Sequence, residues 1–210
     1  MSAQDPQAAL LSALTTEHFV LQTAASSTIS EASARATLYM ASLSSVLVAM
    51  GFSAQTPEVF MPLAATALPA LFLLGVFTIV RLVDTALENM QYLAGIARIR
   101  RHYRSLAPPA SELFGADAGR WPETRTPPSL QLGRRIAFCS TTASMIAFVN
   151  HVVAGAGVTL LVDASMGGDR TALAVAAGVV AALLLTVAFF AYQGWRFAHV
   201  ELAGVADAPR

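Results

Sequence analysis

A nearly continuous apolar stretch from Phe60 to Val80 constrains the fold of this chain more than any other feature. It is 21 residues long, and a helix needs about 20 apolar residues to cross the hydrocarbon core of a bilayer. Composition agrees, because the 210-residue chain is 55% hydrophobic and only 12% charged, whereas a soluble domain has about 25% charged residues. The sequence therefore predicts a protein that crosses the lipid bilayer as α-helices.

The helical pattern continues beyond this span into a more polar segment. Apolar residues recur there with alternating gaps of four and three, at Ile79, Val83, Ala86, Met90, Leu93 and Ala97. This spacing is typical of the seam of a coiled coil. No proline lies between Ala70 and Ala107, so we expect one helix that spans the membrane and continues into the cytoplasm as a stalk over residues 81–104.

Three further apolar stretches, at residues 36–52, 136–162 and 171–195, predict three more spans. Short turns at 51–58 and 163–170 join the spans in pairs. The expected fold is an all-α membrane protein with four transmembrane helices in two hairpins, the first extended into the cytoplasmic stalk. The expected parts are an N-terminal helix (1–35), the first hairpin (36–80), the stalk (81–104), a proline-rich linker (105–133), the second hairpin (134–196) and a cytoplasmic tail (197–210).

The segment from Gln7 to Arg35 is polar but contains no proline or glycine. We favour a helix that packs along the stalk, and the alternative is a disordered tail. Counting outward from a turn centred near Thr56 places Glu17 near Gly95 of the stalk. The first span also repeats small residues at every fourth position, namely Ala41, Ser45 and Ala49, and such a stripe lets helices approach closely in lipid.

Arginine sets the expected orientation. Nine of the thirteen arginines lie between Arg81 and Arg135, while the two short turns contain only Arg170. Basic residues accumulate on the cytoplasmic side of membrane proteins, so we expect both termini and the central region in the cytoplasm. Residues 1–9 contain no basic residue, and no secretory signal is expected. Lysine is absent and alanine is frequent, which we associate with a bacterial source and hence with the inner membrane.

His151 is an ionisable residue deep inside the third span, and Asn150 precedes it. Counting helical rise from Arg135 and from Arg81 puts Thr66 of the second span at a similar depth. Ionisable residues within a membrane mark functional sites, so these polar residues form a candidate intramembrane site. The alternative is a neutral histidine that bonds a serine or threonine of a neighbouring helix.

A basic cluster ends the expected stalk, and we define it as Arg98, Arg100, Arg101, His102 and Arg104. An upright stalk would hold Arg104 about 35 Å beyond Arg81, where the cluster could bind an anionic ligand or an acidic protein partner. A bent stalk would bring it within the roughly 8 Å over which anionic lipids attract basic segments. The alternative is a solvated helix end, where the backbone dipole favours cations.

Several classes of function find no support in the sequence. It contains no glycine-rich phosphate loop, no HExxH and no GxSxG, so we expect neither an enzyme nor a cofactor. Cys139 is the single cysteine, which excludes an intramolecular disulfide and a cysteine-built metal centre. A formal net charge of zero gives no support to nucleic-acid binding.

The segment from Ser33 to Gly51, SARATLYMASLSSVLVAMG, follows a polar helix and resembles the first span of small bacterial membrane effectors of nucleotide-signalled antiphage systems, the Pycsar transmembrane type. The resemblance covers roughly the first quarter of the chain. It implies antiviral defence by membrane impairment that a cyclic nucleotide triggers.

The leading hypothesis is therefore signalling or effector action, with the stalk sensing a cytoplasmic ligand or partner. The alternative hypothesis is a small channel or transporter with a polar site around His151. Four spans enclose little space, so a channel of this size would need several copies, and we expect a homo-oligomer.

Overall fold

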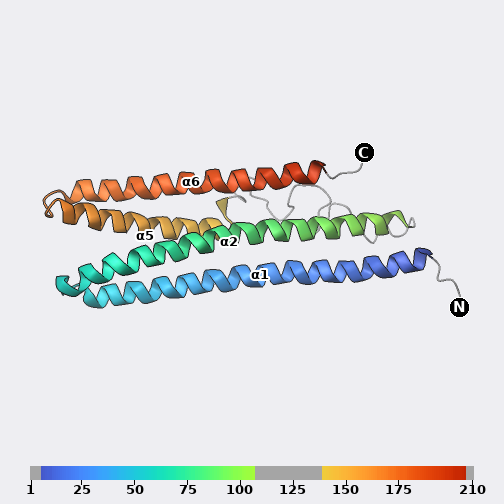
Figure 1. Cartoon of the computed structure of the whole chain (residues 1–210), viewed down its shortest axis with the longest axis horizontal. Helices are drawn as coiled ribbons and strands as arrows, with labels where there is room; N and C mark the ends of the chain where they lie inside the picture. Colours follow the sequence, from blue (N-terminus) through green and yellow to red (C-terminus); the bar gives the residue numbers. More distant parts are fainter. Residues whose placement is uncertain (1–5, 107–138, 207–210) are drawn as a thin grey trace. The chain divides into compact units, whose positions relative to one another are not determined.

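The computed structural model describes residues 6–106 and 139–206 and is almost wholly helical over these ranges (Figure 1). Its long helices are α1 (Pro6–Ser53), α2 (Pro57–Ser105), α5 (Thr142–Ser165) and α6 (Thr171–Ala206). All four contain a window long and apolar enough to cross a membrane, which confirms the prediction of an all-α protein with four candidate spans. The expected linker, apart from its first two residues, and the expected start of the second hairpin at 134–138 lie outside the described residues.

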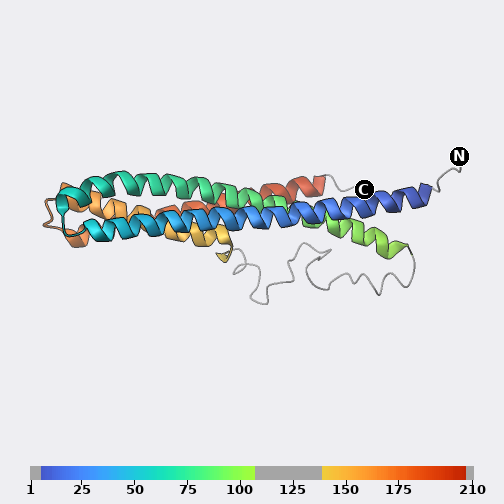
Figure 2. The same cartoon turned by 90° about the horizontal axis from the view of Figure 1, so that it is seen from below.

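Helix α1 joins two segments that the sequence analysis had separated. The expected N-terminal helix and the first span form one helix of 48 residues, which both views show as a continuous rod (Figures 1 and 2). No proline or glycine occurs between Gln7 and Met50, so no residue in this stretch breaks the backbone hydrogen-bond ladder. The helix ends just before Pro57, which begins α2 at a position that tolerates the missing N–H.

The described chain divides into two units, and each is described by itself. The first unit comprises residues 1–32 and 85–140, and the second comprises 33–84 and 141–210. Helices α1 and α2 contribute residues to both units.

In the first unit, α1 packs along α2. Seven buried or partly covered residues of this part of α1 follow gaps of three and four, namely Leu11, Leu14, His18, Leu21, Ala25, Thr28 and Ala32. The Thr28 hydroxyl donates to the Asn89 amide oxygen at 3.3 Å, and the Thr15 and Tyr103 hydroxyls lie 3.4 Å apart. Residues of the N-terminal segment therefore contact residues 89 and 103 of α2 within this unit.

The register of this pairing differs from the expectation. Leu21, rather than Glu17, lies at Gly95, where an added Cβ would be 2.9 Å from the leucine Cδ1. Equal counting from the turn assumes two straight helices, and Pro62 and Pro69 inside α2 remove that condition. The apolar seam expected along α2 is also incomplete, because Met90 is 39% exposed.

The second unit contains the hairpin of α5 and α6, which lie side by side. Thr141 caps α5 by accepting a hydrogen bond from the Ser144 backbone N–H at 3.1 Å, which explains why α5 begins at Thr142. Gly167 and Gly168 have positive φ angles of 67° and 81° and form the turn. The helices approach closely at Gly155, where a Cβ would lie 2.7 Å from the Gly178 carbonyl oxygen.

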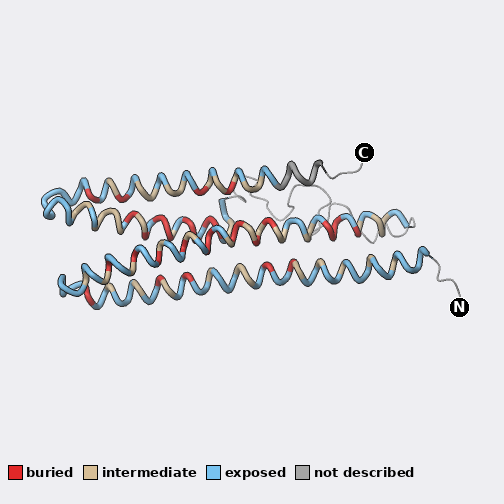
Figure 3. The backbone as a smooth tube through the Cα atoms, viewed as in Figure 1, coloured by how far each residue is buried: buried red, intermediate tan, exposed pale blue. Residues whose placement is uncertain are grey.

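Buried and exposed residues alternate along the helices of each unit (Figure 3). In the second unit the exposed residues include large apolar side chains: Leu38, Leu47, Phe77, Leu161, Leu183, Leu184 and Val187. A soluble domain would bury such a surface, whereas side chains of this kind face hydrocarbon in a lipid bilayer. Helix α6 continues to Ala206, beyond residue 196 where the second hairpin was expected to end, because no proline or turn motif follows Trp195 until Pro209.

Candidate functional site

Asn150 on α5 is completely buried and joins three helices of the second unit. Its side-chain oxygen accepts a hydrogen bond from the Tyr39 hydroxyl of α1 at 3.1 Å. Its side-chain nitrogen donates to the Phe72 carbonyl oxygen of α2 at 3.2 Å. A buried amide costs free energy unless it is hydrogen-bonded. Here the partners of the Asn150 amide come from two neighbouring helices, α1 and α2.

Gly75 makes the space that this amide occupies. A Cβ at position 75 would overlap all three terminal atoms of the Asn150 side chain, so only glycine fits unless that side chain leaves its position. Tyr39 is also completely buried. Asn150 was predicted from the sequence, but Tyr39 and Gly75 were not, because sequence spacing does not show which residues of separate spans share a face.

His151 points toward α6 rather than toward Asn150's partners. Its Nδ1 lies 3.0 Å from the Thr186 hydroxyl, and its ring meets Phe189 edge-on with centroids 6.2 Å apart. The Thr186 hydroxyl donates its proton to the Ala182 carbonyl at 2.8 Å. Since a hydroxyl has one proton, the fitting arrangement has a proton on Nδ1 that His151 donates to Thr186.

A second group of hydrogen-bonded polar side chains lies at the end of the α5–α6 hairpin where α5 begins. Gln193 on α6 is buried, with its oxygen 3.4 Å from the Ser144 hydroxyl and its nitrogen 3.4 Å from the Thr141 hydroxyl. The two hydroxyls lie 2.8 Å apart. Together with His151, these residues place hydrogen-bonded polar groups at two levels of the α5–α6 hairpin.

Asp84 on α2 and Arg196 on α6 form an ion pair in the second unit. Their side chains are 32% and 36% exposed. The pair was not anticipated, since the two residues are 112 positions apart. Asp84 lies three residues after Arg81, close to the point where the apolar stretch ends. This position was the only feature of the sequence that pointed to Asp84.

The structure does not bring Thr66 to the candidate intramembrane site. Thr66 is exposed, and its hydroxyl donates to the Pro62 and Leu63 carbonyls of its own helix at 2.9 and 3.1 Å. Equal depth in two helices does not fix the direction in which each side chain points. The site therefore consists of Asn150 and His151 with Tyr39 and Thr186.

The basic cluster lies in the last turns of α2, within the first unit. Arg98 and Arg101 are exposed, whereas Arg100, His102 and Arg104 are partly covered. Arg100, Arg101 and Arg104 each have interaction partners. The cluster thus contains solvent-accessible guanidinium groups and also arginines that interact with neighbouring residues.

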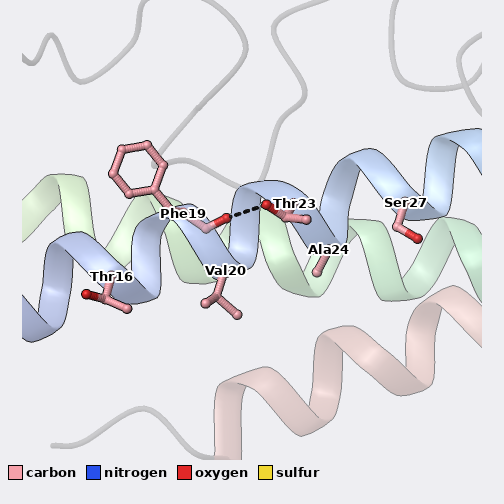
Figure 4. Close-up of a pocket in the computed structure, with 6 residues that line it drawn as sticks. All are labelled: Thr16, Phe19, Val20, Thr23, Ala24 and Ser27. Atoms are coloured by element: carbon pink, nitrogen blue, oxygen red, sulfur yellow. Dashed lines mark hydrogen bonds between the residues drawn. The ribbon is translucent and has the colours of Figure 1, made fainter.

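A shallow hollow of about 530 Å³ also lies in the first unit (Figure 4). All of its lining residues come from one helix, α1, and they are Thr16, Phe19, Val20, Thr23, Ala24 and Ser27. No charged side chain lines it, so the hollow offers no site for an anionic ligand.

Among the described residues, no group of three or more histidine, cysteine, aspartate or glutamate side chains is placed to hold a metal ion. No protein-family model, curated protein or solved structure matches this chain.

Proposed function

We propose that this chain is a non-enzymatic multi-pass protein of the bacterial inner membrane that acts in signalling or as an effector. The basic cluster senses a cytoplasmic ligand or partner, and the membrane-spanning helices respond. The observation that carries this proposal is the continuity of α2, a helix of 49 residues that contains both a strongly apolar window and the basic cluster. An event at Arg98–Arg104 therefore acts on the helix that also crosses the membrane.

The proposed arrangement follows the arginine distribution. Both termini and the basic cluster lie in the cytoplasm, because positive charge favours that side. The spans of α1 and α2 form one transmembrane hairpin and those of α5 and α6 the other. The residues that pair α1 with α2 in the first unit, including Thr28 with Asn89, then form the cytoplasmic stalk.

The chemistry of the cluster defines what it binds. Arginine presents a planar fork of donors that matches phosphate and carboxylate groups, so the ligand is an anionic small molecule or an acidic protein surface. The resemblance of residues 33–51 to Pycsar-type effectors suggests a cyclic nucleotide and a response that impairs the membrane in antiviral defence. The proposal supposes several copies acting together in the bilayer.

The test replaces charge in the cluster without breaking the helix. Changing Arg98, Arg100, Arg101 and Arg104 to Gln keeps helix propensity nearly constant. We expect the loss of membrane depolarisation, measured with a potential-sensitive dye in cells that express the protein. The matched control changes the same four residues to Lys, which keeps the charge and retains at least part of the response.

Unchanged depolarisation by the Gln variant would contradict sensing by the cluster. Binding of the purified proteins to anionic vesicles separates the two sources of negative charge. If the cluster lies on lipid, the Gln variant binds phosphatidylglycerol vesicles more weakly, by roughly 1 kcal/mol for each arginine. If it binds a soluble ligand or a partner, vesicle binding stays the same while the response falls.

A second candidate function is a small oligomeric channel or transporter around His151. It is favoured by the buried polar groups at two levels of α5 and α6, His151 with Thr186 and Gln193 with Ser144. His151→Ala would lower ion flux through reconstituted vesicles if this function holds. Unchanged flux would remove it, and would leave His151 as a hydrogen-bonded structural residue.

A further inference from the structure

One face of α1 is exposed in the described part of the first unit. It is formed by seven exposed residues with alternating gaps of four and three: Ala9, Ala13, Thr16, Val20, Thr23, Ser27 and Ser30. We call it the outer face of α1. Its spacing equals that of the residues of α1 that pack toward α2, and a 3.5-residue repeat is the pattern by which helices associate over a long distance.

The outer face is uncharged, and three of its hydroxyls already donate within α1. Its members are no larger than valine. The hydroxyls of Thr16, Thr23 and Ser30 donate to carbonyls of their own helix at 3.1, 2.9 and 3.2 Å. Because these three protons are already satisfied, covering these three positions exposes no unmet hydrogen-bond demand.

Large apolar side chains on and beside this face remain exposed. Phe19 and Val20 are 63% and 56% exposed, and both line the shallow hollow together with Ala24 (Figure 4). In the proposed topology this part of α1 lies in the cytoplasm, where leaving such surface in water costs free energy. The hollow is lined by residues of one helix only and is open rather than enclosed like a small-molecule pocket.

From these observations we propose that the outer face of α1 binds the outer face of α1 in a second copy of this chain, as a parallel pair of helices. Two copies in one membrane have the same orientation, so their α1 helices run in the same direction. A two-fold axis then places each residue of the face against its own equivalent. The parallel direction of the two helices rests on the proposed membrane topology. It does not depend on the sensing role of the basic cluster.

The residues that flank the face are complementary in this arrangement. In a parallel coiled coil, a flanking residue lies near the residue five positions later in the partner. Phe19 of one copy then meets the small Ala24 of the other, and Ser12 and Ser26 meet the carboxylates of Glu17 and Glu31. Each pair thus combines a large side chain with a small one, or a hydroxyl with a carboxylate, and no carboxylate lies opposite another carboxylate. This complementarity favours a second copy of the chain over an unrelated helix.

The size of the face limits how strong this association can be. It is about 30 Å long and roughly 10 Å wide, so it buries well under the roughly 1,000 Å² that a stable soluble interface needs. The pair therefore forms between copies that a common membrane already concentrates and orients. In the second unit, α1 also exposes Ala41, Ser45 and Ala49, and small residues of this spacing favour helix contact in lipid.

Cysteine cross-linking of the full chain tests the proposal. The background is Cys139→Ala, which removes the single native cysteine. Val20→Cys lies on the outer face, and the matched control Gln22→Cys lies on the same helix, also exposed but off this face. The proteins are reconstituted in phosphatidylcholine vesicles with phosphatidylglycerol and treated with a short bis-maleimide over a range of lipid-to-protein ratios.

We expect a cross-linked dimer from Val20→Cys that persists as lipid dilutes the protein, and monomer from Gln22→Cys. Adding Val20→Glu to a Ser27→Cys variant should abolish its dimer, whereas adding Gln22→Glu should leave it. Equal cross-linking of Val20→Cys and Gln22→Cys, or none from Val20→Cys, would overturn the proposal. A product of Val20→Cys with a different protein in native membranes, in place of the dimer, would overturn it as well.

Discussion

The side-chain amide of Asn150 occupies the space that a Cβ at position 75 would fill. The amide is completely buried and donates to the Phe72 carbonyl of the same helix as Gly75. Helices α2 and α5 therefore meet at a point where backbone faces a polar side chain. Close approach through glycine is a common way for helices to pack in membranes, and here it also satisfies an amide.

Gly75→Ala should destabilise the protein, because the new Cβ forces Asn150 away from its two partners. Overpacking of this kind costs about 1–3 kcal/mol, which thermal unfolding in detergent would register as a lower midpoint. Gly157→Ala is the matched control, since a Cβ there would meet Leu68 at an ordinary 3.9 Å. Equal stability of the two variants would contradict this packing.

Tyr39→Phe should leave the Asn150 oxygen without its donor while preserving shape. Hydrogen bonds between membrane helices contribute about 0.6 kcal/mol on average and reach about 1.7. We expect a loss of unfolding free energy in this range. In a double-mutant cycle with Asn150→Ala, the effect of Tyr39→Phe should shrink once the acceptor is gone; strictly additive losses would show that the two side chains do not interact in the membrane.

The secondary structure was largely predictable from sequence, whereas the polar contacts were not. Long apolar runs without proline, such as residues 136–162, identify spans because a helix must cover the full thickness of the bilayer. Hydropathy does not report rotation about a helix axis, so Thr66 and His151 were grouped by depth although Thr66 is exposed. The partners of Asn150 and the Asp84–Arg196 pair depend on that rotation and on which spans are neighbours.

The N-terminal segment illustrates a different limit. Its polar composition allowed either disorder or a helix, and the structure has one helix from Pro6 to Ser53. The leucines at 11, 14 and 21 lie on the partly covered side of this helix. The absence of proline and glycine was therefore informative about the helix, but the register against α2 could not be counted from the turn, since α2 contains Pro62 and Pro69.

Single cysteines test the proposed topology, again with Cys139→Ala as the background. Cysteine at Gln55 or Gly168, in the two short turns, should react with a membrane-impermeant maleimide added to intact cells. Cysteine at Ser111 should react only after permeabilisation, because the proposed topology places the arginine-rich central region in the cytoplasm. Labelling of Ser111→Cys from outside would reverse the orientation and place the basic cluster on the wrong side for a cytoplasmic ligand.

The most direct test of the central claim interrupts α2 between the basic cluster and the membrane span. Leu93→Pro removes a backbone hydrogen bond and kinks or breaks the helix at a cost of about 3 kcal/mol, while leaving both the span and the arginines unchanged. Leu106→Pro is the control, because it lies just past the end of α2 at Ser105. Depolarisation of expressing cells and circular dichroism of the purified proteins are measured together. The account predicts that Leu93→Pro loses helix and loses the membrane response while it still inserts, and that Leu106→Pro keeps both. A full response from Leu93→Pro, with its helix content reduced, would contradict transmission through α2.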